Sequence, residues 1–352
     1  MVLAKLANTS LKGISVTVPT KTLSLLDDPK LYDGNKQKVR RVIESSGFLK
    51  RRIADHNTTS ADLCEYAARD LLRHLSIKSE MIDGLLFISC TPDYFVPATS
   101  YVLHGKLGLS ENCVVADIPQ ACSGFVFGLY QAAMMLNSGC KKVLLLVGDT
   151  FSKFSDMFRE HTAPVFGDAG TAILLEYNPL ASPVYFNILS DGSLHEALVC
   201  RNGAFRNPID KDSFYEDGSY CYEAKMDGAG IFNFALEKVA QSIEEVLEYA
   251  NTQKEEIDIY ILHQANKFII RSIASQLKMP ENLFPMSTLT EYGNQCGASI
   301  PCAICDSLKE KIVSKVNKVL FSGFGAGLSW ISVVMDIKLA YCSPVLEYRS
   351  LN

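Results

Sequence analysis

Apolar and polar positions follow two different periods along this chain. Short, nearly continuous apolar runs predict buried strands, and stretches in which apolar residues recur every three or four positions predict helices. The predicted strands cover residues 13–18, 84–89, 114–118, 141–147, 259–262 and 318–321. The predicted helices begin near Thr59, follow Cys122 and cover residues 233–249. Strands that alternate with helices are typical of an α/β protein whose parallel sheets are buried between layers of helices.

The order of these elements returns about 175 residues further along the chain, as a duplicated fold requires. Three pairs of segments carry the repeat: Glu80-Met-Ile-Asp and Glu255-Glu-Ile-Asp, Leu107-Gly-Leu-Ser-Glu-Asn and Leu277-Lys-Met-Pro-Glu-Asn, and the strands at 141–147 and 318–321, after each of which a glycine follows. We therefore predict two homologous α/β halves, residues 1–178 and 179–352, which join near residues 178–183.

Composition narrows the class of protein without naming its chemistry. The chain has 352 residues, of which 48% are hydrophobic and 21% are charged, as in an ordinary soluble globular protein. A net charge of −5 and the lack of a basic block argue against a nucleic-acid binder. No apolar stretch has the length of a signal peptide core or a membrane span, so we expect a cytoplasmic protein. The 11 cysteines form no paired spacing, which predicts neither a zinc site nor a disulfide framework.

Cys122 lies where a predicted strand gives way to a helix, in the segment Gln120-Ala-Cys-Ser-Gly. The free N–H groups and positive dipole end of a helix favour an anion, so they lower the pKa of a nearby thiol and favour a nucleophilic thiolate. The small neighbouring residues leave room for a substrate. A buried structural thiol is the alternative, because unpaired cysteines are among the most buried residues. The position alone leaves both interpretations open.

Three features of the second half are ambiguous when each is taken alone. His263 follows the predicted strand at 259–262, where open α/β sheets gather their ligands, but a buried core histidine also fits there. Asn294, in Tyr-Gly-Asn, is typical of a tight turn. The run Gly323-Phe-Gly-Ala-Gly suits a turn after a strand, and because no capped helix follows it, it does not predict a dinucleotide site.

Taken together and in order, these segments resemble the β-ketoacyl-acyl carrier protein synthase III family, which has the thiolase-like fold. The resemblance rests on Asp117-Ile-Pro-Gln-Ala-Cys-Ser-Gly-Phe, His263-Gln-Ala-Asn, Tyr292-Gly-Asn, Ala298-Ser-Ile-Pro and Gly323-Phe-Gly-Ala-Gly-Leu-Ser-Trp. Further landmarks are Arg51-Arg-Ile-Ala, Thr91-Pro-Asp, Phe166-Gly-Asp-Ala-Gly and Ser190-Asp-Gly-Ser. The resemblance covers most of the chain and implies two duplicated halves in a layered αβαβα sandwich.

The resemblance also implies a reaction and roles for its residues. Cys122 would take an acyl group from acyl-coenzyme A or an acyl carrier protein, and a malonyl group on carrier protein would then lose carbon dioxide and condense with it. Backbone N–H groups of Cys122 and of the glycine loop at Gly325 would form the oxyanion hole. His263 and Asn294 would hydrogen-bond the enolate. The family needs no bound metal or cofactor and implies a homodimer.

The chain departs from the family pattern in three places. Members primed by short acyl-coenzyme A commonly carry Trp and Arg where this chain has Arg41 and Ser45, so coenzyme A and carrier protein both stay open as acyl donors. Val96 stands where a bulky aromatic residue often closes the acyl pocket across the dimer interface, and we predict that longer or bulkier acyl chains fit. Residues after Ile337 extend beyond the usual end of the family.

Basic residues follow His263-Gln-Ala-Asn on a predicted helix. Lys267, Arg271 and Lys278 have the spacing of one helix face. On an acidic protein they suit a docking patch for an acidic carrier protein, which charge would steer. A solvated helix face explains the same spacing equally well.

Three other functions compete with a condensing enzyme. Cys, His and Asn in this order also occur in papain-like proteases, but those carry a different sequence around a cysteine near the mature N-terminus. An acyltransferase of the same fold could pass the acyl group to oxygen or nitrogen without decarboxylation, although Asn294 favours condensation. A noncatalytic partner subunit is disfavoured because all three reactive residues are present.

Overall fold

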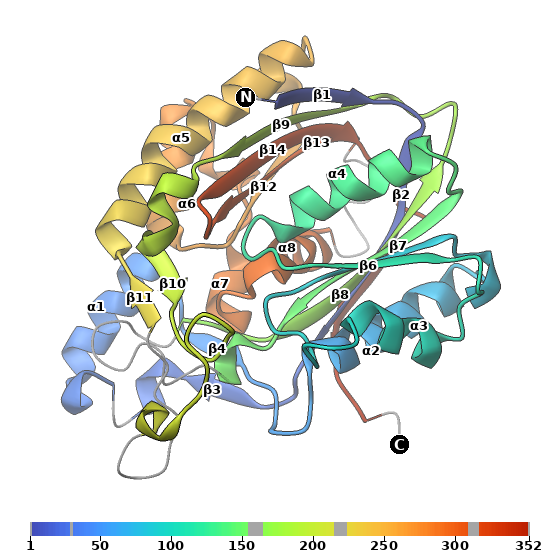
Figure 1. The fold of residues 1–352 in the computed structure, drawn as a ribbon. Helices are drawn as coiled ribbons and strands as arrows, with labels where there is room; N and C mark the ends of the chain where they lie inside the picture. The colour runs from blue at the N-terminus through green and yellow to red at the C-terminus, as the bar shows by residue number, and fades with distance from the viewer. Residues whose placement is uncertain (1, 29–30, 154–164, 215–223, 309–316, 351–352) are drawn as a thin grey trace.

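Two β-sheets and the helices that cover them form this protein. The computed structural model describes residues 2–28, 31–153, 165–214, 224–308 and 317–350. Helices lie between the two sheets and on the outer side of each, which gives five layers (Figure 1). The alternation of apolar runs and helical stretches in the sequence predicted this layered α/β architecture.

The first sheet is built mainly by the first half of the chain. Its strands, in spatial order, are β15 (Tyr341–Glu347), β2 (Thr9–Val18), β8 (Ala169–Tyr177), β7 (Lys142–Asp149), β5 (Gly84–Ile88) and β6 (Val114–Ile118). β5 runs parallel to β6 and to β7, as predicted. β8 was not among the predicted strands, and it runs antiparallel to both β7 and β2. The sheet is therefore mixed, not wholly parallel.

The second sheet has the spatial order β1 (Val2–Leu6), β9 (Val184–Ser190), β14 (Ser329–Asp336), β13 (Lys318–Gly325) and β12 (Ile259–Leu262). β12 and β13 are parallel, and the other pairs are antiparallel. Only residues 326–328 separate β13 from β14. A parallel pair needs a crossover of about a dozen residues or more, so this short link forces an antiparallel hairpin. The predicted parallel pairing therefore holds for β12 with β13 but not for β13 with β14.

The two terminal strands each lie in the sheet of the other half. β1, at the start of the chain, pairs with β9 in the second sheet, while β15, near its end, pairs with β2 in the first. The predicted division at residue 178 therefore does not separate the two sheets. The residues after Ile337, whose role the sequence left open, supply β15 at one edge of the first sheet.

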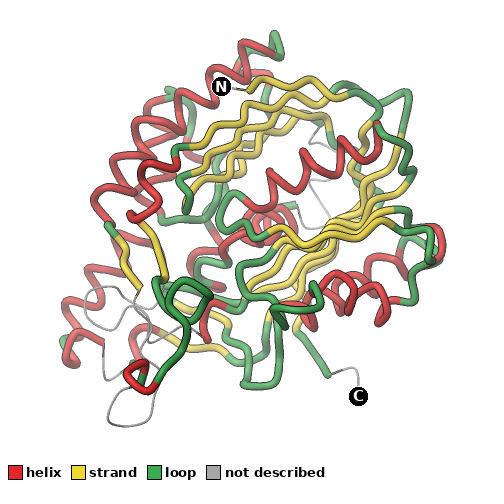
Figure 2. Tube along the Cα trace, viewed as in Figure 1, coloured by secondary structure: helices red, strands yellow, loops and turns green. Residues whose placement is uncertain are grey.

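Three apolar cores hold the five layers together, and Figure 2 shows the two sheets in yellow with helices in red on both faces of each. The central core joins α4 (Gly124–Asn137) and α8 (Ser299–Ser307) to the facing sides of both sheets. The outer cores pack α2 (Ser60–His74) and α3 (Thr99–Leu107) on the first sheet, and α5 (Gly228–Tyr249) and α6 (Lys267–Gln276) on the second. Burial of one large apolar side chain stabilises a fold by about 1.5–3 kcal/mol.

Smaller elements complete the fold. Two short antiparallel pairs join β3 (Thr22–Ser24) to β4 (Lys50–Arg52) and β10 (Leu198–Cys200) to β11 (Ala224–Met226). Further helices are α1 (Lys36–Ser46) and α7 (Ser287–Tyr292). Thr59 caps α2 through a reciprocal hydrogen-bonded box with Asp62, which confirms the helix start that the sequence predicted.

Matching hydrogen bonds reveal the sequence repeat in three dimensions. Asp83 precedes β5, and its Oδ2 accepts two backbone N–H groups, each 2.8 Å away, where β7 begins. Asp258 precedes β12, and its Oδ2 accepts two backbone N–H groups, 2.8 and 3.0 Å away, where β13 begins. One carboxylate therefore ties two neighbouring parallel strands at their start in each half.

The helices α3 and α6 also end in the same way. Gly108 and Lys278 follow them with φ angles of 63° and 56°, in the left-handed region that ends a helix. After α3 the N–H of Leu109 donates to His104 O at 3.1 Å. After α6 the N–H of Met279 donates to Ala274 O at 3.0 Å. Lys278 therefore lies in a turn beyond Gln276, and the prediction that it shares a helix face with Lys267 and Arg271 was wrong.

Candidate active site

Cys122 lies in the turn that joins β6 to α4, between the two sheets. Ser123 is the N-cap of α4, so the thiol precedes the first turn of the helix, and it is 8% exposed. The end of β13 passes very close to it. A Cβ atom on Gly325 would lie 2.6 Å from Cys122 Cβ and 3.0 Å from its sulfur. Only glycine therefore leaves room for the thiol at this end of the strand.

Polar contacts tie the turn of Cys122 to the second half of the chain. Ser329 is the first residue of β14, and its Oγ lies 2.7 Å from Ser123 Oγ. The amide Nε2 of Gln120 donates to both hydroxyls, at 2.7 and 2.9 Å. Because both serines are almost fully buried, these bonds hold the turn firmly against the second sheet.

His263 lies at the C-terminal end of β12, and it is 2% exposed. Its backbone N–H continues the ladder between β12 and β13 by donating to Ser322 O at 2.8 Å. The imidazole stands edge-on to the ring of Phe324, with centroids 5.5 Å apart. The ring therefore has a fixed position at the place where the sequence predicted a ligand site.

Ser299, the first residue of α8, determines which nitrogen of His263 is free. Its Oγ lies 2.7 Å from Nδ1 of His263 and accepts the N–H of Gln264 at 3.4 Å. This contact occupies Nδ1 and leaves Nε2 as the free nitrogen of the ring. Nε2 carries a proton in the imidazolium and in one of the two neutral tautomers. His263 can therefore act as a hydrogen-bond donor through Nε2.

Asn294 follows the left-handed Gly293 after α7, and it is 7% exposed. Its backbone N–H donates to Val165 O at 2.8 Å, and its carbonyl accepts the N–H of Gly167 at 3.0 Å. The side-chain Oδ1 accepts the N–H of Cys296 at 2.9 Å. With the oxygen engaged in this way, the NH₂ end of the carboxamide remains as a donor for a ligand.

Cys296 joins the segment of Asn294 to Cys122. Its sulfur lies 3.8 Å from the sulfur of Cys122, and both residues are buried. Cys296 itself has a φ angle of 51°, in the left-handed region that residues with a Cβ rarely adopt. The sequence analysis did not single out this residue, although it stands only two positions after Asn294.

These neighbours favour the thiolate of Cys122. The hydrogen bond from Cys296 is the largest influence and lowers the pKa of Cys122, against the raising effect of burial. The charge and hydrogen bond of His263 and the N–H of Ala326 lower it further, so the pKa of Cys122 is well below the usual cysteine value. The pKa of Cys296 is raised for the reciprocal reason, because its proton bonds to Cys122.

Asp149, at the end of β7, lies on the other side of Cys296. Its Oδ1 accepts the N–H of Cys90 at 2.8 Å and the Ser89 hydroxyl at 3.2 Å. Burial raises the pKa of Asp149 to about 7, and these hydrogen bonds oppose the shift. The sequence analysis missed this carboxyl group, whose only signal was its place at the end of a buried strand.

The predicted oxyanion loop lies against Cys122. Gly325 is the residue in steric contact with the thiol, whereas the backbone N–H that hydrogen-bonds the sulfur belongs to the next residue, Ala326. Backbone N–H groups near the reacting atom suit the stabilisation of a developing oxyanion. The geometry therefore favours Ala326 over Gly325 as the donor from this loop.

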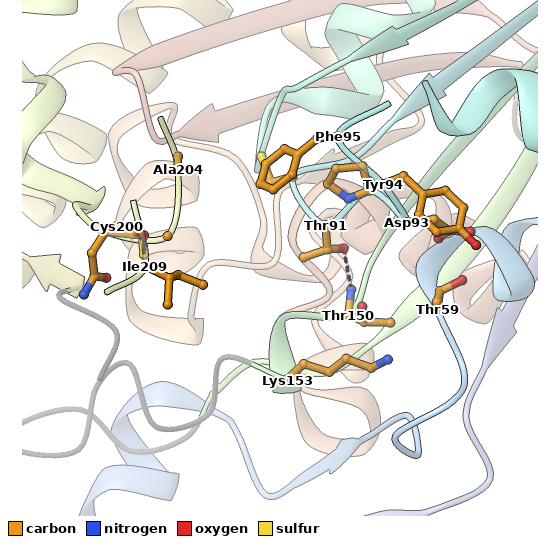
Figure 3. Close-up of a pocket in the computed structure, with 14 residues that line it drawn as sticks. Thr59, Thr91, Asp93, Tyr94, Phe95, Thr150, Lys153, Cys200, Ala204 and Ile209 are labelled. Atoms are coloured by element: carbon orange, nitrogen blue, oxygen red, sulfur yellow. Dashed lines mark hydrogen bonds between the residues drawn. The ribbon is translucent and has the colours of Figure 1, made fainter. Parts of the chain in front are cut away.

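Two cavities adjoin the site, and Cys90 lines both. One has a volume of about 500 Å³, lies beside Ala121 and is also lined by Ala326 to Ser329. The other, about 640 Å³, is shown in Figure 3. In Figure 3, Tyr94 and Phe95 lie on one side and Ile209 on the other. Thr150 donates its N–H to Thr91 Oγ1 at 3.0 Å in the wall of this cavity.

The other predicted site residues lie away from the thiol. Val96 is 85% exposed on the surface beside Phe95. Lys267 begins α6 and Arg271 follows one turn later, where its Nε is 2.8 Å from Glu281 Oε1. Arg41 lies on the exposed side of α1. The structure thus brings together the thiol, the imidazole and the carboxamide segment, and leaves the pocket and docking residues on the surface.

The described residues cover 2–28, 31–153, 165–214, 224–308 and 317–350. Within those ranges, no group of three or more His, Cys, Asp or Glu side chains is placed to hold a metal ion. Among the helices of the same ranges, none is long and apolar enough to cross a membrane.

Comparisons with known proteins show the family of this chain. The sequence profile of 3-oxoacyl-[acyl-carrier-protein (ACP)] synthase III matches residues 116–212, and that of its C-terminal part matches residues 247–337. A putative 3-oxoacyl-[acyl-carrier-protein] synthase 3 of Campylobacter jejuni is 34% identical over 347 residues, which are 96% of each chain. A β-ketoacyl-[acyl-carrier-protein] synthase III of Streptococcus mutans is 32% identical over 323 residues, 91% of this chain and 96% of that one.

A solved structure supports the same assignment. The crystal structure of a 3-oxoacyl-(acyl-carrier protein) synthase from Burkholderia xenovorans superposes with a TM-score of 0.90 at 33% identity and covers 99% of both chains. The predicted thiolase-like α/β fold is therefore confirmed. The chain belongs to the 3-oxoacyl-[acyl-carrier-protein] synthase III family of acyl-condensing enzymes.

Proposed function

We propose that this protein condenses an acyl group, held on Cys122, with a malonyl thioester on acyl carrier protein, and that carbon dioxide is released. The observation that carries the proposal is the meeting of groups from the two halves. Cys122 from the first half lies close enough to His263 from the second for the imidazole to lower the pKa of the thiol. Its sulfur is also 3.8 Å from that of Cys296, whose N–H holds the carboxamide of Asn294.

In the first step the thiolate of Cys122 attacks the carbonyl carbon of an acyl thioester. The lowered pKa of Cys122 favours the thiolate, which is the attacking species. The carbonyl oxygen becomes negative and accepts the N–H groups of Cys122 and Ala326. The donor's carbon–sulfur bond then breaks, its thiol leaves, and the acyl group stays on Cys122. Loss of one such oxyanion donor typically slows a reaction by about 10²–10³-fold.

In the second step a malonyl thioester loses carbon dioxide, and its thioester oxygen takes the negative charge of an enolate. The Nε2–H of His263 and the NH₂ of Asn294 donate to that oxygen. The enolate carbon attacks the acyl carbonyl, forms the new carbon–carbon bond and expels the thiolate of Cys122. The product is a β-ketoacyl thioester on the carrier, and the enzyme returns to its starting state.

Mass spectrometry with and without a thiol at residue 122 tests the first step. Incubation with acyl-coenzyme A or acyl carrier protein should add one acyl group to the protein, and Cys122→Ala should abolish the adduct. Cys200→Ala removes an exposed thiol and is the matched control, which should keep the adduct. An adduct that survives in Cys122→Ala would reject Cys122 as the acyl carrier.

Carbon dioxide release tests the second step. We expect Asn294→Ala to keep the acyl adduct on Cys122 but to lose most of the carbon dioxide released from malonyl carrier protein. The rival function, transfer of the acyl group to oxygen or nitrogen, needs no carbon dioxide release. An acylated enzyme that releases none, but transfers its acyl group to an alcohol or amine, would establish the rival.

We further propose that acyl carrier protein docks beside α6 in the cytoplasm. Lys267 and Arg271 supply positive charge there, although Arg271 already pairs with Glu281. Lys267→Glu should therefore weaken the reaction with carrier-bound substrates more than Arg271→Glu does, and added salt should reduce the difference. Rates with the same acyl group on coenzyme A are the control. Equal losses with both donors would reject the docking role.

We also propose a homodimer whose interface covers the surface around Val96. Tyr94 is 59% exposed, Phe95 is 73% exposed and Phe205 is 89% exposed, and the rings of Phe95 and Phe205 are 5.6 Å apart. Exposed apolar groups that gather in this way support a covering partner. Val96 would then border the acyl pocket from across the interface. Light scattering tests the dimer, and a chain-length profile limited to acetyl would reject the wide pocket.

A further inference from the structure

A second thiol stands next to the proposed nucleophile, and the proposed reaction does not use it as a reacting group. The sulfur atoms of Cys122 and Cys296 are 3.8 Å apart, and both residues lie in the core between the halves. The two backbones are also close here. A Cβ atom on Gly124 would lie 3.8 Å from the Cα of Gly297, and a Cβ on Gly297 would lie 3.0 Å from Ala121 O.

Local backbone contacts fix the position of Cys296. Its N–H is held by Asn294 Oδ1 at 2.9 Å, and its backbone has a left-handed φ of 51°. Its sulfur is 3.8 Å from that of Cys122, and it also lies beside the buried carboxyl group of Asp149. The nucleophile therefore has a partner thiol at a fixed place, beside a group that can take up a proton.

We propose that a hydroperoxide converts Cys122 and Cys296 into a reversible disulfide, so that Cys296 is the resolving thiol that protects Cys122 from irreversible oxidation. The inference goes beyond the proposed condensation. It concerns the enzyme while Cys122 carries no acyl group, because an acyl thioester leaves no free sulfur to oxidise.

The chemistry needs only the hydroperoxide and the two thiols. The thiolate of Cys122 attacks one peroxide oxygen, the O–O bond breaks, and Cys122 becomes a sulfenic acid while water or an alcohol leaves. The sulfur of Cys296 then attacks the sulfur of Cys122. Asp149 takes the proton of Cys296 and passes it to the departing hydroxide. The S–S bond forms, the S–O bond breaks, and the hydroxide leaves as water. A dithiol reverses the reaction by exchange.

The geometry permits each step. Cys122 is 8% exposed beside the cavity that Ala121 and Ala326 line, so a molecule as small as hydrogen peroxide can reach it. Cys296 is 2% exposed, which favours Cys122 as the first sulfur to react. A disulfide bond is about 2.05 Å long, so the two sulfurs must approach by roughly 1.7 Å. Rotation of the two side chains and a small shift of the Cys296 backbone supply this approach.

Treatment of the purified full-length protein with hydrogen peroxide tests the proposal. After digestion without reductant, mass spectrometry should find the peptide of Cys122 linked to that of Cys296, with the loss of two hydrogens. Dithiothreitol should separate the peptides and restore most of the activity lost to peroxide. Prior incubation with an acyl donor should suppress the link. Absence of the linked peptide, or a link from Cys122 to Cys90 instead, would overturn the proposal.

Two variants separate the resolving role from a general effect of thiols. Cys296→Ser keeps a hydrogen-bonding group but cannot form the disulfide, so peroxide should drive Cys122 to sulfinic acid, and dithiothreitol should no longer restore activity. Cys342→Ser removes one member of another close pair, in which the sulfurs of Cys342 and Cys305 are 3.7 Å apart. This control should recover like the unmodified protein. Equal recovery of Cys296→Ser would also overturn the proposal.

The disulfide is detected by mass and does not depend on which reaction the enzyme performs. A linked Cys122–Cys296 peptide in a protein that releases no carbon dioxide would refute the condensation and keep the disulfide. Condensation without a linked peptide would refute the disulfide and keep the condensation.

Discussion

Ser299 Oγ lies 2.7 Å from Nδ1 of His263, at the point where α8 begins. This contact orients the imidazole and leaves Nε2 free for a ligand. The hydroxyl touches neither Cys122 nor a substrate in the proposed reaction, so Ser299 is a positioning residue. Contacts of this kind often change an activity by about 10–100-fold when they are removed.

We therefore expect Ser299→Ala to slow decarboxylation by about tenfold or more, because the imidazole loses its fixed orientation. Acyl loading of Cys122 should fall much less, since it depends on the thiolate and on backbone N–H groups. Single-turnover mass spectrometry measures the loading, and carbon dioxide release measures the second step. An equal fall in both steps would contradict the orienting role.

Cys296 should control the pH at which Cys122 reacts. In Cys296→Ala the hydrogen bond that most lowers the pKa of Cys122 is absent, so the alkylation rate of Cys122 should reach its plateau at a higher pH. Loss of one hydrogen bond to a charged group corresponds to a shift of about one to two pH units. Iodoacetamide alkylation followed by mass spectrometry gives the profile.

Cys296→Ser is the conservative comparison, because its hydroxyl can donate in place of the thiol, and it should show the smaller shift. Cys342→Ala lies in a separate sulfur pair and should leave the profile unchanged. Identical profiles for Cys296→Ala and the unmodified protein would show that the Cys296 thiol does not tune Cys122.

Gly325 should tolerate no side chain. Its φ of 158° and the 2.6 Å approach of a built Cβ to Cys122 Cβ mean that Gly325→Ala must displace the nucleophile or the end of β13. We expect a large loss of Cys122 alkylation and a lower melting temperature. Gly105→Ala, in the interior of α3 with no atom within 4 Å of the added carbon, should instead stabilise the protein by about 0.5–1 kcal/mol. Normal reactivity in Gly325→Ala would contradict the steric argument.

Asp149 should make stability depend on pH between about 4 and 7. Burial raises its pKa from 3.8 to about 7 in the folded protein, so the folded state favours the protonated carboxyl group. The stabilisation is complete below pH 3.8 and is lost as the pH rises through 7. The side chain in Asp149→Asn cannot ionise. As the pH rises over this range, the free energy of unfolding of the variant should therefore increase relative to that of the unmodified protein, by up to about 4 kcal/mol.

Urea unfolding of both proteins at several pH values measures this difference. The asparagine keeps an oxygen that can accept the N–H of Cys90, which limits other effects of the substitution. Above pH 7 the difference should stay constant. A difference that does not vary between pH 4 and 7 would contradict a raised pKa for Asp149.

The sequence was most informative where local physics decides the structure. The helix predicted to begin near Thr59 does begin there, because Thr59 and Asp62 form a capping box within one turn of the chain. A helix follows Cys122 as predicted, and the apolar residues that recur along it every three or four positions are buried: Phe125, Leu129, Ala132, Ala133 and Leu136. The repeated Asp83 and Asp258 each tie neighbouring strands, which explains why similar segments stand in both halves.

The sequence was least informative about which strands become neighbours. Nothing local to residues 2–6 places β1 in the second sheet, and nothing local to residues 341–347 places β15 in the first. Strand pairing depends on backbone groups far apart in the chain, and the side-chain pattern of a strand does not name its partner. The prediction that Lys278 shares a helix face with Lys267 and Arg271 was also wrong, because α6 ends at Gln276 and Lys278 has a left-handed backbone beyond it.

By itself, the sequence determined the class of the fold, its duplication and the three residue types that a condensing enzyme needs, because periodicity and ordered motifs are local properties of a chain. Only the tertiary structure decided that Cys296 and Asp149 adjoin Cys122 and that Ala326 presents its N–H to the sulfur. These groups come from β7, the segment after α7 and the end of β13, and only packing of the two halves brings them within hydrogen-bond range.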